Sequence, residues 1–138
     1  MLLAIAGKPG SGKSAVAKKL AQFFDLELIS FGPIFRRKAK EMNLSLEEFG
    51  SYAEKHIEVD KKIDEEQLNY IRRGNCAVDS RLGCYLAWRE GVPSIKVYLK
   101  AGLEVRARRS DRSSYSCYTV SPFLVKKREK SEKRRYME

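Results

Sequence analysis

The strongest constraint on the fold is a short glycine-rich segment near the start of the chain. It fits the pattern Gly-x4-Gly-Lys-Ser and reads Gly7-Lys8-Pro9-Gly10-Ser11-Gly12-Lys13-Ser14. An apolar run at residues 2–6 precedes it and is typical of a buried parallel strand, while the residues after it have the apolar spacing of a helix. A strand, a tight loop and a helix in this order predict a phosphate-binding loop in an α/β fold.

The parts of this loop have predicted roles in holding a nucleoside triphosphate. Gly10 and Gly12 tolerate the backbone conformations that turn successive N–H groups toward one anion. The helix that begins near Lys13 directs its positive end at the phosphates. Lys13 can reach the β and γ phosphates, and the hydroxyl of Ser14 can ligate Mg²⁺. We therefore expect ATP and Mg²⁺ to bind at residues 7–14, although many unrelated proteins share this loop and it does not define a reaction.

The rest of the chain alternates strands with helices. Further strands are predicted at residues 26–30, 76–79 and 94–99, with helices between them. One helix is predicted to open at Gly32-Pro33, with Pro33 in the first helical position, and Ser45 with Glu48 forms a capping box before another. Residues 110–121 are predicted to form a loop. The pattern predicts one domain over 1–138, a three-layer α/β sandwich of the P-loop NTPase type around a parallel sheet.

Composition narrows the classes of partner. The chain has 28 Lys and Arg against 18 Asp and Glu, a net charge of +10, which favours an anionic partner. No apolar stretch has the roughly 20 residues that span a bilayer, and no signal-peptide pattern is present, so we expect a cytoplasmic protein without a membrane partner.

Arginines after the other strands indicate a second anion site. Arg36 follows the second predicted strand, Arg81 follows the third, and Arg106 and Arg109 follow the fourth. The carboxyl ends of parallel strands share the sheet edge that carries the phosphate-binding loop. These side chains are therefore predicted to meet in one crevice, as a transfer between two phosphorylated substrates requires.

Several segments together resemble the archaeal-type cytidylate kinases, nearly along the whole chain. They are Ser30-Phe31-Gly32-Pro33-Ile34-Phe35-Arg36, Asp79-Ser80-Arg81-Leu82, Lys100-Ala101-Gly102-Leu103-Glu104-Val105-Arg106, Leu46-Glu47-Glu48-Phe49 and the tail from Glu129 to Tyr136. The resemblance implies that the γ-phosphoryl of ATP is transferred to CMP or dCMP, giving ADP and CDP or dCDP, with Mg²⁺.

The resemblance also implies roles for the acceptor site. Ser30, Gly32 and Arg36 would lie in the monophosphate site, and the monophosphate-binding helical segment would span about 31–73. Arg81 would hold the same phosphate or the base, and Asp79 could organise the water shell of Mg²⁺.

Two further sets of residues have roles implied in the same way. Asp60 and Asp64 would contact ribose or base, and the alternative of two solvated helix carboxylates stays open. Arg106 and Arg109 would belong to a lid at about 106–121 that closes over the transferring phosphoryl group.

The sequence also departs from the family pattern. Pro33 stands where an acidic residue is usual, and Asp79-Ser80 replaces a Glu-Gly pair. Family members continue past Tyr136 with a further strand and helix, so a four-stranded sheet of order 2-3-1-4 is expected here, with an exposed edge beside the fourth strand. A monomer or a weak dimer is expected.

Two alternatives stay open from the sequence. The acceptor could be AMP, UMP or another small molecule. The chain could also be a non-catalytic P-loop module that binds nucleotide or nucleic acid through its basic tail, although no nucleic-acid-binding motif accompanies that tail and a solvated helix face is the expected interpretation.

Overall fold

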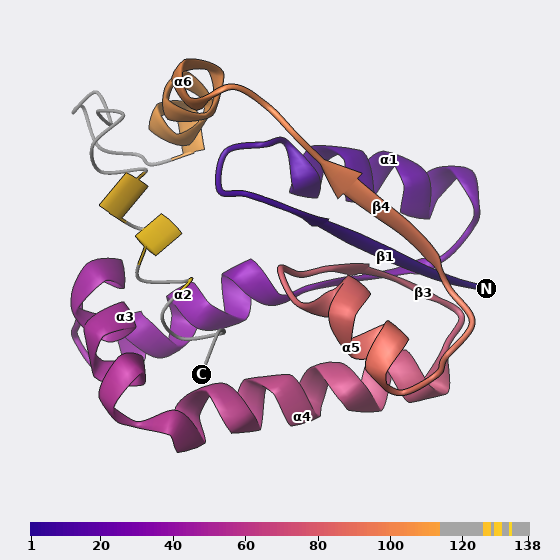
Figure 1. Cartoon of the computed structure of the whole chain (residues 1–138), viewed down its shortest axis with the longest axis horizontal. Coiled ribbons are helices and arrows are strands. Elements are labelled where there is room, and N and C mark those ends of the chain that lie inside the picture. Colours follow the sequence, from indigo (N-terminus) through magenta and orange to yellow (C-terminus); the bar gives the residue numbers. More distant parts are fainter. Residues whose placement is uncertain (114–125, 128, 131–132, 134–138) are drawn as a thin grey trace.

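The computed structural model describes residues 1–113, 126–127, 129–130 and 133, and the description below concerns these residues (Figure 1). Four parallel strands form one sheet of order β2-β3-β1-β4, as predicted. The strands are β1 (Leu2–Gly7), β2 (Glu27–Ser30), β3 (Cys76–Asp79) and β4 (Ile95–Leu99). Strand β1 lies in the centre, since Leu3 pairs with Ala77 of β3 on one side and with Ile95 of β4 on the other.

Helices cover both faces of the sheet, which gives the predicted three-layer sandwich (Figure 1). Helix α1 (Lys13–Phe23) packs Ala17 and Ala21 against Leu3 and Ile5 of β1. The other face is covered by α4 (Ile57–Arg73) and α5 (Gly83–Arg89), whose apolar side chains pack in one cluster with Leu2 and Val78. Because successive strand residues point to opposite faces, neighbouring residues of β1 contribute to both cores.

Three helices fill the segment between β2 and β3. They are α2 (Phe31–Glu41), α3 (Leu46–Lys55) and α4. The predicted capping box is confirmed, since Ser45 Oγ accepts from the backbone N–H of Glu48 and the Glu48 carboxylate accepts from the backbone N–H of Ser45. The prediction for Pro33 is wrong by two positions. Helix α2 begins at Phe31, directly after the extended Ser30, so the end of β2 turns into the helix without a connecting loop.

Helix α6 (Leu103–Ser113) follows β4. Residues 110–113 continue this helix, so the predicted loop does not begin at Ser110. The rest of the predicted lid, residues 114–121, lies outside the described residues. Across the described ranges, no helix has the length and apolar character that crossing a membrane requires.

Candidate active site

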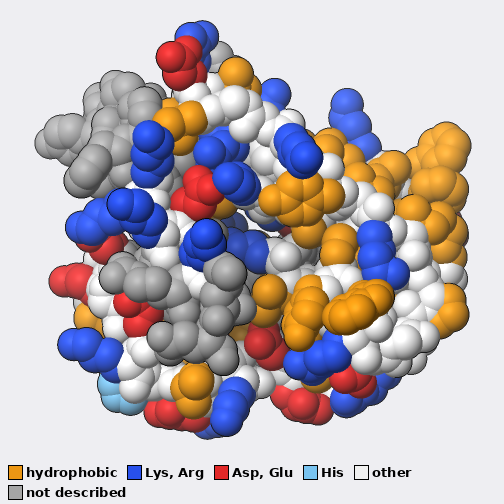
Figure 2. Space-filling view, in the orientation of Figure 1, with side chains coloured by type: hydrophobic (Ala, Val, Ile, Leu, Met, Phe, Trp, Pro, Cys, Tyr) orange, Lys and Arg blue, Asp and Glu red, His pale blue; other side chains and the backbone are white. Residues whose placement is uncertain are grey.

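A cavity of about 460 Å³ lies at the carboxyl ends of β1, β2 and β3. This volume is in the usual range for a small-molecule site. Figure 2 shows Lys and Arg side chains gathered around the hollow in the middle of one face of the molecule. Ten of the residues singled out from the sequence line the cavity: Pro9, Gly10, Gly12, Lys13, Ser14, Gly32, Arg36, Asp79, Arg81 and Arg109.

The phosphate-binding loop has the backbone that its glycines predict. Gly7, Gly10 and Gly12 have φ angles of 151°, 75° and 96°, all in the region that side chains rarely adopt. A Cβ atom on Gly7 would lie 2.6 Å from the carbonyl oxygen of Leu99 in β4. The loop therefore folds back closely against the sheet, and this closeness requires glycine.

Two arginines of α6 donate hydrogen bonds to backbone carbonyl groups of this loop. Arg109 Nη1 donates to the carbonyl oxygen of Ser11 at 3.0 Å, and Arg106 Nη1 donates to that of Pro9 at 3.4 Å. Arg109 also lines the cavity, whereas Arg106 is buried beside the loop and does not. Helix α6 thus contacts the loop from the side opposite to β3, because β1 lies between β3 and β4.

The wall opposite the loop carries the second set of cations. Arg36 is on α2, and its guanidinium lies beside Gly32, where an added Cβ atom would be 3.5 Å from Nη1. Arg81 follows β3 and lines the same cavity. The structure thus places the lysine of the loop and two arginines from other strand ends around one space.

Asp79 is the buried carboxylate of this cavity. It ends β3, is 4% exposed, and accepts a hydrogen bond from Ser30 Oγ at 3.4 Å. Mg²⁺ keeps several waters and uses few protein ligands, so one hydroxyl and one carboxylate suit it. Ser14 and Asp79 supply these two groups in the same cavity. In the described part of the chain, no cluster of three or more acidic, histidine or cysteine side chains suits a metal ion.

The sequence did not indicate a series of hydrogen bonds in the wall of the cavity, which joins Ser80, Gln67 and Asp64. Gln67 of α4 is 3% exposed and lines the cavity, and its Oε1 accepts from Ser80 Oγ. Its Nε2 donates to Asp64 at 3.2 Å, which fixes the orientation of the amide. The signal available was spacing, because Gln67 is one turn beyond Asp64 and two turns beyond Asp60 on one helix face.

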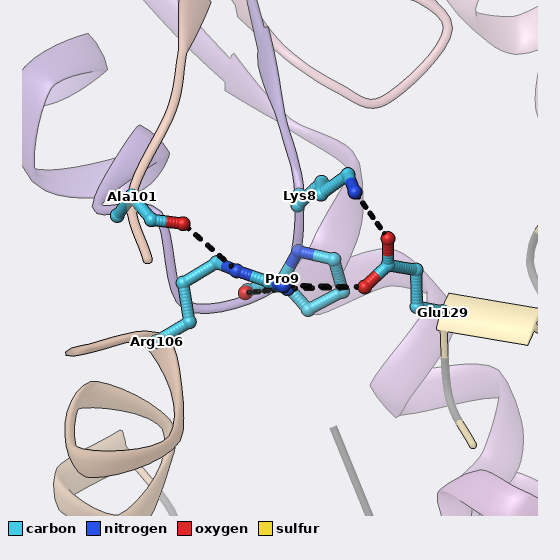
Figure 3. A network of polar contacts seen from close by, with 5 residues as sticks. All are labelled: Lys8, Pro9, Ala101, Arg106 and Glu129. Atoms are coloured by element: carbon cyan, nitrogen blue, oxygen red, sulfur yellow. Dashed lines mark hydrogen bonds and ion pairs between the residues drawn. The ribbon is translucent and has the colours of Figure 1, made fainter. Parts of the chain in front are cut away.

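The remaining predicted site residues do not line the cavity. Asp60 is buried on α4, and Asp64 accepts a hydrogen bond from Gln67, which does line the cavity. Ser30 supports Asp79, and Ser11 is buried within the loop. Lys8 is exposed and forms an ion pair with Glu129 (Figure 3).

The fold and the site define a class. A parallel sheet of this order, a phosphate-binding loop after its central strand and a second set of arginines facing that loop are the features of a P-loop kinase. A family model described as an AAA domain matches residues 6–117.

Curated relatives narrow the class to one family. A cytidylate kinase of Methanocaldococcus jannaschii is 38% identical over 139 residues, covering 100% of this chain and 78% of the relative. One of Methanosarcina barkeri is 41% identical over 140 residues, covering 99% and 77%, and one of Pyrococcus horikoshii is 32% identical over 137 residues, covering 99% and 70%. The chain belongs to the cytidylate kinase family.

Proposed function

We propose that the protein transfers the γ-phosphoryl group of ATP to CMP and dCMP, forming ADP with CDP or dCDP. One observation carries this proposal: the phosphate-binding loop, Arg36 and Arg81 line a single cavity. A hydrolase or a simple nucleotide binder needs cations for one phosphate chain, whereas a transferase must hold two phosphorylated molecules with their reacting oxygens in line. The names of the relatives support cytidylate as the acceptor.

The donor side of the proposed mechanism uses the loop. The N–H groups of Gly10 and Gly12 and the N-terminus of α1 bind the phosphates, and Lys13 neutralises charge that develops on the transferring group. Ser14 and Asp79 would hold Mg²⁺, the latter through the ion's water shell, and the ion would supply further charge neutralisation on the phosphate oxygens.

The acceptor side uses the opposite wall. Arg36 and Arg81 bind the phosphate of the monophosphate and bring its oxygen into line with the γ-phosphorus, which removes much of the entropic cost of the reaction. An acceptor phosphate is already an anion at neutral pH, so the transfer needs no general base. Arg109, which donates to the loop at Ser11, is positioned to contact the transferring group from the α6 side.

A coupled assay of ADP formation tests the proposal. With ATP and Mg²⁺, we expect turnover with CMP and dCMP at kcat/KM values at least about tenfold above those with UMP and AMP, the size of one good polar contact to the base. Equal or greater turnover with UMP or AMP would overturn the choice of acceptor. Tight, salt-dependent RNA binding with no turnover on any monophosphate would favour a nucleic-acid-binding protein instead.

A further inference from the structure

Glu129 reaches the phosphate-binding loop from far along the sequence. Its carboxylate forms an ion pair with Lys8 Nζ at 2.5 Å and accepts from both terminal nitrogens of Arg106 at 3.3 Å. Figure 3 shows the contacts of the Glu129 carboxylate with Lys8 and with Arg106, next to Pro9 of the loop. The two basic side chains hold the pKa of Glu129 below its usual value, with Lys8 the larger cause. The contact is therefore a charged one at neutral pH.

Arg106 needs this carboxylate because it is a buried cation. The residue is 5% exposed, and its Nε donates to the carbonyl oxygen of Ala101 at 3.1 Å. Of the described residues, Glu129 alone places a carboxylate within ion-pair distance of it. A buried guanidinium without a counter-charge is costly, so the loss of Glu129 would displace the Arg106 side chain or admit water to it.

The Arg106 guanidinium also orients a peptide group of the loop. Its Nη1 donates to the carbonyl oxygen of Pro9, which belongs to the Pro9–Gly10 peptide. A trans peptide is planar, with its C=O and N–H pointing in opposite directions. A carbonyl held toward Arg106 therefore turns the Gly10 N–H away from Arg106. Gly10 lines the cavity, whereas Arg106 does not. Arg109 acts in the same sense on the Ser11–Gly12 peptide.

We propose that Glu129 is a positioning residue for the triphosphate site, acting through Arg106 and Lys8 on the N–H groups of the loop. By holding two cations, it fixes the peptide at Gly10 before nucleotide binds. A loop that is already ordered loses less conformational entropy when nucleotide binds. The contact therefore raises nucleotide affinity, although Glu129 does not touch the nucleotide. The inference concerns the donor site alone and does not depend on which acceptor is used.

Glu129→Gln tests the proposal, since it keeps the size of the side chain and removes its charge. We expect affinity for ADP and ATP, measured by calorimetry without acceptor, to fall about tenfold, and the KM for ATP to rise with little change in the KM for CMP. Glu129→Asp keeps the charge with a shorter reach and should recover part of the affinity. In amide NMR spectra without nucleotide, the Gly10 and Gly12 resonances should shift in Glu129→Gln.

Glu47→Gln is the matched control. Glu47 of α3 forms an exposed ion pair with Lys127, which is two residues from Glu129 along the chain. Glu47 does not line the cavity. Glu47→Gln removes the ion pair with Lys127 instead of the contacts of Glu129. It should leave nucleotide affinity and the Gly10 and Gly12 resonances as in the wild type. If Glu47→Gln and Glu129→Gln weaken nucleotide binding equally, the effect comes from losing any contact of the chain near Lys127 and Glu129, and the proposal is wrong.

A double-mutant cycle guards against a merely structural effect. Lys8→Gln and Glu129→Gln should be non-additive in nucleotide affinity, because each removes the same ion pair. A Glu129→Gln protein with a lowered melting temperature but wild-type nucleotide affinity would overturn the proposal. If Glu129→Gln does not fold, Glu129→Asp must show a raised KM for ATP with little change in the KM for CMP. An unchanged KM for ATP in Glu129→Asp would also overturn the proposal.

Discussion

At the scale of single residues, Gly7 links the strand to the loop. Its φ of 151° is unfavourable for any side chain, and the space beside it is occupied by the backbone of β4 and by Ser11 Oγ, 2.8 Å from an added Cβ atom. The backbone carbonyl of Leu99 cannot move aside without separating β1 from β4, since Gly7 pairs with Leu99 in the sheet. Gly7 is therefore required by the fold as well as by the phosphate site.

Gly7→Ala should destabilise the protein by about 3 kcal/mol or more, combining the cost of a strained backbone with that of overpacking. Urea unfolding measures this difference, and nucleotide binding should be lost even where the protein remains folded. Gly102→Ala is the matched control, because no heavy atom lies within 4 Å of its added Cβ. Near-equal unfolding free energies for the two variants would contradict the steric argument.

Residue identity predicted only part of the site. Lys13, Ser14 and Arg36 carry groups whose chemistry is evident from the sequence, and each lines the cavity. Gln67 and Glu129 could not be found in that way, because an amide on a helix and a carboxylate in a basic tail are common surface residues. Their importance comes from burial and from a partner distant in the sequence, such as Ser80 for Gln67.

At the scale of elements, α3 shapes one wall of the acceptor side. Its Phe49 is 1% exposed and packs edge-on against Phe35 of α2, with ring centroids 4.6 Å apart. Phe35 and Leu46, the first residue of α3, both line the cavity. The start of α3 must therefore be well defined for this wall to form, and the capping box at Ser45 provides that definition.

Ser45→Ala should cost about 1 kcal/mol of unfolding free energy, the usual value of a serine N-cap. Hydrogen bonds from Ser45 lower the pKa of the Glu48 carboxyl group. The stability that this carboxylate contributes through the capping box is therefore present above its unfolded pKa, and it is lost as the pH falls through its lowered folded pKa. The difference between wild type and variant should therefore shrink in acid. Unfolding curves of the wild type and the variant at neutral and acidic pH measure this difference. Ser51→Ala is the control, since Ser51 is exposed. An equal loss of stability in Ser51→Ala would contradict the role of the cap.

The elements themselves were largely predictable. Apolar runs predicted all four strands. The reason is clearest for β1 and β3, whose residues are all buried, because strands buried on both faces have little polar content. The edge strands β2 and β4 have exposed residues and were predicted from their short apolar runs. The start of α2 was misplaced because Pro33 is a general signal for a first helical turn, whereas the backbone at Ser30 decides where the helix begins. The continuation of α6 to Ser113 was missed because a run of Ser, Asp and Arg lacks apolar periodicity.

At the scale of the whole molecule, strand order separates the proposed donor and acceptor sites. The loop follows β1, the proposed acceptor residues Arg36 and Arg81 follow β2 and β3 on one side of it, and α6 follows β4 on the other side. The proposed donor and acceptor groups thus belong to neighbouring strand ends, while helix α6 lies on the opposite side of the loop (Figure 1). This arrangement follows from topology, and it predicts that donor and acceptor binding can be weakened separately.

Arg36→Ala should raise the KM for CMP about tenfold or more and leave ATP affinity close to that of the wild type, since it removes a charge-assisted contact from the acceptor wall alone. Lys13→Ala should lower kcat about a thousandfold, because that charge serves the transferring group. Arg37→Ala is the control for Arg36, since Arg37 is exposed, pairs with Glu41 at 3.7 Å and does not line the cavity. Steady-state kinetics with each substrate varied separately measure all three. If Arg36→Ala weakened the binding of ATP and left the KM for CMP unchanged, the loop and Arg36 would bind the same ligand. The assignment of two sites to neighbouring strand ends would then be wrong.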